Sequence, residues 1–251
     1  TGASQGTSPI TVGNVTSFTL SGLITDTTYY LTVTAYNADN NESWYSARIQ
    51  VTAQPTAVKL AFLTQPGSAV AGTAFATSPT VVIQDAESNT LVTSSALVTL
   101  SITPGKGTAG ALLSGPTMVT AVGGVATFGG LSINRAGVGY TLSATSPGLT
   151  GAVSQPLAVA PGPAARLAFT TQPWGAVAGL QFTTQPVVEV QDTFGNTVTA
   201  SPATVTVSIT PGTGSSGAFL SGTAVVNAVN GVATFSGLAG LGDLVATCSS
   251  P

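Results

Sequence analysis

The chain has 251 residues and a formal net charge of −3, and only 5% of its residues are charged, against about 25% in an average soluble domain. Its five basic residues are scattered singly, so the sequence offers no basic patch for nucleic acid. No apolar run approaches the roughly 20 residues that a membrane-spanning helix needs. Histidine is absent and Cys248 is the only cysteine. No intramolecular disulfide can therefore form, and we expect Cys248 to be an unreactive small residue of a strand.

The first 54 residues show a strand pattern of their own. Apolar and polar side chains alternate over residues 29–36, which indicates a half-buried β-strand. Strands are also expected at residues 18–20 and 48–52, with a polar loop at 37–43. This order resembles the second half of a fibronectin type III domain, without the strands that normally precede it. The resemblance implies that Tyr29 is the corner tyrosine, with its hydroxyl bonded to backbone just upstream.

Two aromatic residues, Trp44 and Tyr45, directly follow the polar loop. Exposed aromatic side chains mark interfaces, so the pair could stack on a sugar or on a partner's surface. The same two residues could instead cover the end of their own sandwich. The sequence leaves both interpretations open, and Trp44 and Tyr45 are its candidate contact residues.

The rest of the chain consists of two near copies. Residues 60–131 match residues 167–238 at 43 of 72 positions with a constant offset of 107. A period of this length is one whole domain. We therefore expect one domain at 57–160 and a second at 164–251, joined by the stiff sequence Pro161-Gly162-Pro163. Trp174, near the start of the second copy, is expected to pack between neighbouring domains.

Strand signals recur through each copy at spacings of roughly 12–20 residues, with turn formers between them and no helical period. This pattern predicts an antiparallel β-sandwich. Comparing the copies identifies the core face: Val81 is matched by Val188, whereas Val82 is matched by Glu189. A charge is tolerated where its side chain reaches water, so Val82 is expected to point outward. The expected strands of the first copy begin near Leu60, Thr80, Ala96, Leu112, Gly124, Gly139 and Ala152.

A turn of the form Asp-x-x-x-Asn follows a strand in both copies, at residues 85–89 and 192–196, and the sequence Gly-Val-Ala-Thr-Phe lies downstream of each. This order resembles the bacterial immunoglobulin-like domains of the invasin and intimin type, which occur in tandem on bacterial surface proteins. The resemblance implies an all-β fold of tandem Ig-like and fibronectin III-like sandwiches, arranged as beads on a string. Ser88 stands where that family usually has glycine. The first turn is therefore expected to differ slightly from the second, which has Gly195.

The acidic residues show no catalytic arrangement. With no histidine, none of them can belong to a triad, and their positions in turns do not suggest a carboxylate pair. Asp85, Glu87 and Asn89 could offer oxygens to Ca²⁺, but side chains that close a turn explain the same residues more simply. We expect no enzyme activity, no catalytic residue, no metal and no cofactor. The eight acids are Asp26, Asp39, Glu42, Asp85, Glu87, Glu189, Asp192 and Asp243.

These features favour a structural segment of an extracellular bacterial surface protein: a stalk, rod or filament. The alternative is an adhesive or carbohydrate-binding accessory module of a surface protein or a secreted glycan-degrading enzyme. The expected partners are other copies of the chain, flanking domains of a longer chain, or surface glycans. The second copy loses five residues after Leu238 and has no counterpart of residues 152–160. Its fold would be completed by a longer chain or by a strand from a neighbouring subunit.

Overall fold

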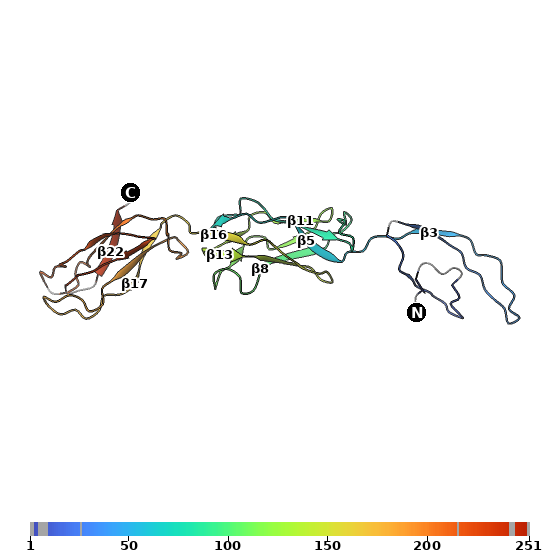
Figure 1. The fold of residues 1–251 in the computed structure, drawn as a ribbon, viewed down its shortest axis with the longest axis horizontal. Coiled ribbons are helices and arrows are strands. Elements are labelled where there is room, and N and C mark those ends of the chain that lie inside the picture. Colours follow the sequence, from blue (N-terminus) through green and yellow to red (C-terminus); the bar gives the residue numbers. More distant parts are fainter. Residues whose placement is uncertain (1–2, 5–9, 26, 215, 241–243, 250–251) are drawn as a thin grey trace.

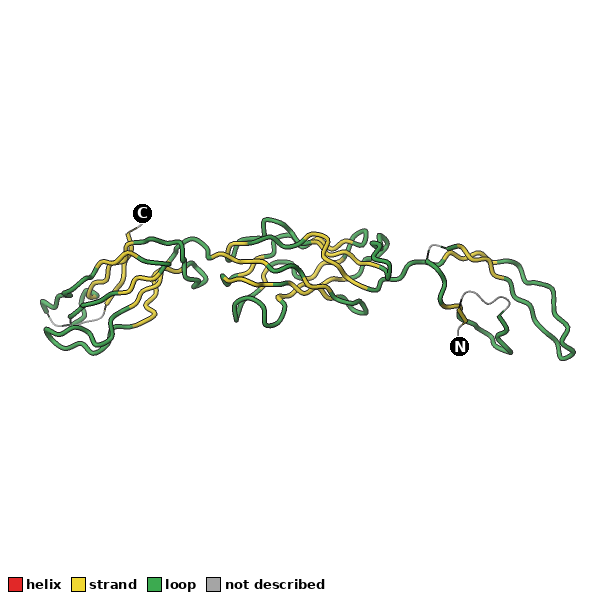
Figure 2. Tube along the Cα trace, in the orientation of Figure 1, coloured by secondary structure: helices red, strands yellow, loops and turns green. Residues whose placement is uncertain are grey.

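The computed structural model describes residues 3–4, 10–25, 27–214, 216–240 and 244–249. All regular structure in the described residues is β, with no helix. Three parts follow one another in sequence order along the longest axis of the molecule (Figure 1). The second and third parts are compact sandwiches, whereas the first is mostly loop (Figure 2). The fold class is therefore all-β, as predicted.

The first part consists of two small strand pairs. Strands β1 (Ala3–Ser4) and β2 (Leu20–Ser21) are parallel, and β3 (Thr28–Leu31) and β4 (Ile49–Thr52) are antiparallel. None of the described residues between positions 10 and 54 is buried. The Tyr29 hydroxyl accepts a hydrogen bond from the Ile24 N–H at 2.8 Å, which confirms the predicted corner contact.

The first sandwich is built mainly from three sheets, whose strand orders are β11-β7-β5, β10-β8-β14-β15 and β13-β16-β6; β9 and β12 form a further pair. The sequence predicted an antiparallel sandwich. One strand pair departs from this prediction, because β6 and β16 are parallel. The strands are β5 (Lys59–Thr64), β6 (Ala69–Val70), β7 (Thr80–Gln84), β8 (Leu97–Ile102), β9 (Leu113–Ser114), β10 (Met118–Thr120), β11 (Val125–Thr127), β12 (Ser132–Ile133), β13 (Gly137–Tyr140), β14 (Leu142–Thr145), β15 (Ala152–Val153) and β16 (Leu157–Ala160).

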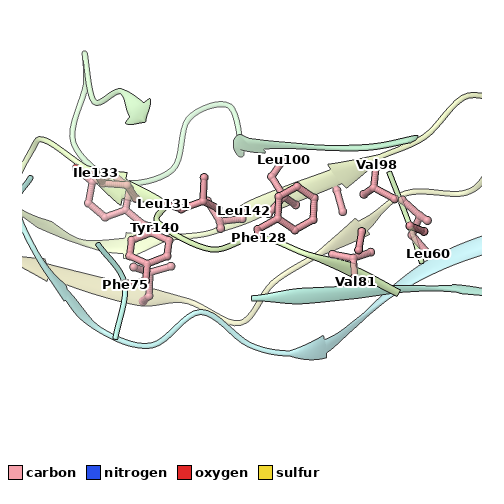
Figure 3. Close-up of a cluster of buried hydrophobic side chains, with 14 of the residues drawn as sticks. Leu60, Phe75, Val81, Val98, Leu100, Phe128, Leu131, Ile133, Tyr140 and Leu142 are labelled. Atoms are coloured by element: carbon pink, nitrogen blue, oxygen red, sulfur yellow. The ribbon is translucent and has the colours of Figure 1, made fainter. Parts of the chain in front are cut away.

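One continuous apolar core runs between these sheets. Leu60, Val81 and Val98 lie toward one end and Phe75, Ile133 and Tyr140 toward the other, with Leu100, Phe128 and Leu142 between them (Figure 3). Burying each of these aliphatic or aromatic side chains contributes about 1.5–3 kcal/mol. Tyr140 is fully buried, and its hydroxyl donates to the Arg135 carbonyl at 2.9 Å, so its polar atom is satisfied.

The second sandwich repeats the first in register. Leu167 pairs with Val190 as Leu60 pairs with Ile83, and Val207 pairs with Ala246 as Leu100 pairs with Ala144. Two sheets, with orders β17-β18-β21 and β20-β19-β22, enclose a second core. Over these two sheets, the prediction that the copies share one fold with matching cores is confirmed. The strands are β17 (Arg166–Thr171), β18 (Val187–Gln191), β19 (Thr204–Ile209), β20 (Val225–Asn227), β21 (Val232–Thr234) and β22 (Leu244–Ser249).

Strand β22 forms an edge of its sheet. Among the described residues its only strand partner is β19, whereas the matching strand β14 pairs with both β8 and β15. Cys248 lies in β22 as a free, exposed thiol, so its predicted place in a strand is correct.

The predicted exposure of Val82 is wrong. Its neighbours Val81 and Ile83 are fully buried in the core, as expected, but Val82 is itself only 4% exposed. The reason is its position on the middle strand β7, where its sheet neighbours are Ala61 and Val125. Val82 is nevertheless outside the core cluster, and its counterpart Glu189 is half-buried. It therefore lies on the outer face of the sheet, covered by its neighbours.

Candidate functional site

The acidic side chains of the described residues lie apart from one another or close turns. No group of three or more His, Cys, Asp or Glu side chains among those residues is placed to hold a metal ion. Two of the eight acids, Asp26 and Asp243, lie outside the described residues. The described part of the chain also contains no helix that is long and apolar enough to cross a membrane.

The Asp85 carboxylate closes the turn that follows β7. It accepts the Asn89 N–H at 2.8 Å and the Asn89 side-chain amide at 3.1 Å. Burial raises the pKa of Asp85, but the hydrogen bonds from Asn89 and Glu87, with the charge of Lys59, hold it below its ordinary value. Two of the three residues considered for Ca²⁺, Asp85 and Asn89, therefore close this turn with their side chains.

The two Asp-x-x-x-Asn turns share one backbone conformation, contrary to the expectation drawn from Ser88. Ser88 has φ 74° and Gly195 has φ 81°, both in the left-handed region. A side chain at this φ is strained. Ser88 is held there by a hydrogen bond from the Lys59 ammonium group to its hydroxyl at 2.8 Å. The first copy thus keeps the turn without the glycine.

The turn of the second copy makes more hydrogen bonds than the first. Asp192 Oδ1 accepts the N–H groups of Phe194 and Asn196, and its Oδ2 accepts the Asn196 side-chain amide at 2.8 Å. Oδ2 also accepts the N–H of Gly162, from the linker between the sandwiches, at 2.9 Å. Burial raises the pKa of Asp192, but these hydrogen bonds together hold it below its ordinary value.

Asn196 reaches across to the first sandwich. Its side-chain oxygen accepts the Ala136 N–H at 3.0 Å, and its amide nitrogen donates to the Asn134 carbonyl at 2.9 Å. The carboxamide therefore engages one donor and one acceptor of the same loop. From the sequence, Asn196 was predicted only to be part of a turn. Nothing in the sequence of the second copy indicates that it contacts the first sandwich.

A second feature of the surface lies in the irregular ribbon that continues from β3 and β4. Val33 and Ser46 exchange hydrogen bonds, with the Val33 N–H donating to the Ser46 hydroxyl at 2.9 Å and the Ser46 N–H to the Val33 carbonyl at 2.8 Å. Ala35 and Ser43 make the same pair of contacts at 2.9 and 2.7 Å. At each point the serine hydroxyl therefore takes the place of one main-chain carbonyl, and the other main-chain bond is kept.

Between these two contacts, one segment has the single residue Thr34 and the other has two, Trp44 and Tyr45. One extra residue opposite a single partner is a β-bulge, which redirects side chains. We call residues 43–46 the aromatic bulge. Trp44 is 95% exposed and Tyr45 is 73% exposed, so neither covers the end of a sandwich in the described structure. With Glu42 and Ser43 they line an open hollow.

Two more aromatic side chains lie in the same ribbon. The charge of Glu42 raises the pKa of the Tyr36 hydroxyl, with burial and a hydrogen bond to the same carboxylate adding to the effect. The Arg48 guanidinium lies 4.8 Å from the centre of the Tyr30 ring, within the range of a cation–π contact. The ribbon thus carries aromatic groups with charged neighbours.

The expected role of Trp174 at the joint is wrong. Its side chain is 77% exposed, and its backbone pairs with Thr184 of its own sandwich. The aromatic residue at the joint is Phe194, whose ring lies against Gly72 of the first sandwich. The counterpart of Phe194 in the first copy is Glu87, so the repeat pattern did not mark it as a contact residue.

The chain matches no protein-family model and no curated protein. Among solved structures, it is similar to the Escherichia coli adhesin FdeC, with 19% identity over 89% of this chain and 69% of that one, at a TM-score of 0.37. Domains 1–6 of the surface layer protein SbsC share 17% identity over 89% of this chain and 32% of theirs, with a TM-score of 0.33. A β-glucuronidase of Parabacteroides merdae shares 17% identity over 53% of this chain and 17% of its own, with a TM-score of 0.29.

Proposed function

We propose that this chain is a spacer segment of an extracellular bacterial surface protein, in which repeated β-sandwiches supply length. The observation that carries the proposal is the in-line order of two sandwiches with the same fold (Figure 1). Domains stacked in this way gain reach with each repeat, whereas a catalytic protein needs a site that repetition does not build. The sequence resemblance to bacterial Ig-like domains supports the same role and a location at the cell surface.

The chemistry of the acidic side chains also supports a structural role. The buried carboxylates of both Asp-x-x-x-Asn turns accept local hydrogen bonds, and the chain holds no histidine to act as a general base. We therefore propose that the segment has no enzyme activity of its own. A turnover by the purified chain that is lost when one acidic residue is changed to its amide would refute this.

Other copies of the chain, or flanking domains of a longer one, are the proposed partners. The open edge of β22 presents main-chain N–H and C=O groups that a further strand can pair with. A strand from the same polypeptide and a strand from a neighbouring subunit would satisfy these groups equally well. Sedimentation of the purified chain over a range of concentrations distinguishes them, because only the second source gives an assembly.

The surface location is tested on intact cells of the source bacterium. We expect an antibody against the purified chain to label unbroken cells, and we expect external protease to remove the signal. A cytoplasmic protein of the same cells serves as the control for lysis. Labelling that appears only after the cells are broken would refute the surface role.

An adhesive module is the second candidate, and the aromatic bulge favours it. Flat, exposed rings stack on sugar faces and on partner surfaces, and both rings of the bulge, Trp44 and Tyr45, are exposed. Binding to a glycan array should then be lost in Trp44→Ala and Tyr45→Ala. Trp174→Ala is the matched control, because Trp174 is also exposed but lies in the second sandwich. Equal binding by all variants, or none by the parent, would refute this role.

A further inference from the structure

We propose that the turn at residues 192–196 is an interdomain lock, which docks the second sandwich onto the end of the first in one orientation. Its partner surface is the end of the first sandwich, where one loop offers the Asn134 carbonyl and the Ala136 N–H to Asn196. This inference concerns the stiffness of the joint and does not depend on where the protein is located.

The loop that receives Asn196 is held by its own sandwich. The Tyr140 hydroxyl donates to the Arg135 carbonyl at 2.9 Å, and the Thr108 hydroxyl donates to the Ala136 carbonyl at 2.7 Å. The Asn134 side-chain oxygen accepts the Leu112 N–H at 2.8 Å. These bonds fix the loop, while the Asn134 carbonyl and the Ala136 N–H bond to Asn196. The donor and acceptor are therefore positioned before the sandwiches meet, which lowers the cost of ordering them.

Two further contacts converge on the same turn. The Asp192 carboxylate binds the linker through the Gly162 N–H. The Phe194 ring lies so close to Gly72 that a Cβ at this glycine would overlap it. The turn therefore contacts the first sandwich, its receiving loop and the linker at once. Because these three contacts lie in different directions, they restrict rotation of one sandwich relative to the other about the linker.

The matching turn of the first copy lacks these features. At the same offset of 107, Gly162 corresponds to Pro55, which has no N–H to donate to Asp85, and Phe194 corresponds to Glu87. Asn89 keeps its hydrogen bonds to Asp85 but is exposed. The local turn is thus common to both copies, and the interdomain contacts belong to the second alone. The lock is therefore a property of one joint, and the turn sequence by itself does not produce it.

The two copies supply matched controls. Asn196→Ala removes the two interdomain bonds and the side-chain bond to Asp192, whereas Asn89→Ala removes only the side-chain bond to Asp85. Gly72→Ala places a methyl group against Phe194, whereas Gly179→Ala, at the matching position, meets no atom within 4 Å. Both glycines have nearly the same φ, 74° and 75°, so the backbone strain of the two alanine variants is equal. The difference between the two variants of a pair therefore reports the contribution of the interdomain contacts alone.

The test measures the distance between the sandwiches directly. Spin labels are attached to Val122→Cys and Val229→Cys, which are exposed matching positions in the two copies, in a Cys248→Ser background. Double electron–electron resonance then gives the distribution of the interlabel distance. We expect one narrow distribution in the parent chain and at least a twofold broader one in Asn196→Ala. Asn89→Ala should keep the parent width.

The glycine pair tests the same contact without touching the turn. Gly72→Ala should shift the mean distance or broaden the distribution, because the new methyl group pushes Phe194 away, and Gly179→Ala should do neither. The comparison of Gly72→Ala with Gly179→Ala still tests the proposal if Asn196→Ala unfolds the second sandwich. A broad distribution in the parent, or equal effects of Gly72→Ala and Gly179→Ala, would overturn the proposal.

Discussion

Placing a glutamate at Val82 or at Val81 tests which face of β7 lies on the core. Val81 is fully buried in the core cluster. Val81→Glu loses about 1.5–3 kcal/mol of apolar burial and adds several kcal/mol for an unpaired buried carboxylate. Since a domain is stable by about 5–15 kcal/mol, this change should unfold most or all of the first sandwich.

Val82→Glu should cost much less, although Val82 is also nearly inaccessible to solvent. The second copy already carries Glu189 at this position, where its carboxylate accepts hydrogen bonds from Gln191 at 3.0 Å and Thr197 at 2.9 Å. The first copy has the same two partners, Gln84 and Thr90. Two bonds to a charged group contribute about 1.5–3 kcal/mol each, which offsets the lost valine burial. We expect a net change within about 2 kcal/mol.

Hydrogen–deuterium exchange in urea, resolved by peptide mass spectrometry, is the suitable assay. The chain has only two tryptophans, Trp44 and Trp174, so tryptophan fluorescence does not report on the first sandwich. Peptides from β7 and β8 should lose protection in Val81→Glu at all urea concentrations. In Val82→Glu, their urea midpoint should move only slightly. Equal loss of protection in both variants would refute the assignment of Val82 to the outer face.

Two further predictions concern the joint. Tyr140→Phe leaves the Arg135 carbonyl without its bond and should cost the first sandwich about 1–3 kcal/mol, as measured by the same exchange assay; an unchanged urea midpoint would show that the hydroxyl does not stabilise the loop. The pKa of Asp192 is lowered in the folded state, so its contribution is fully present above the unfolded pKa of about 3.9 and is lost as pH falls through the folded pKa. The Val122–Val229 distance distribution should therefore broaden below about pH 4, and Asp192→Asn should remove this pH dependence; the same broadening in Asp192→Asn would assign it to another group.

The sequence alone determined the class of fold and the core. The alternation of apolar residues predicts the strands. The repeat of 107 residues shows which face of each strand is buried, because both copies must bury the same face to fold. Comparing the copies correctly placed Val81 and Val188 in the cores. The corner bond of Tyr29 was also predictable, because its partner lies only five residues upstream.

Tertiary structure decided how the surface and the joint are built. Val82 is covered because β7 is the middle strand of its sheet, and sheet order is set by contacts distant in sequence. The aromatic bulge arises from the unequal pairing of two segments. Phe194 and Gly72 are 122 positions apart in the chain, and Asn196 meets a loop of the other copy. Alternation reports which face of a strand is buried within its own domain, but contacts between domains depend on the shapes of both surfaces after each has folded.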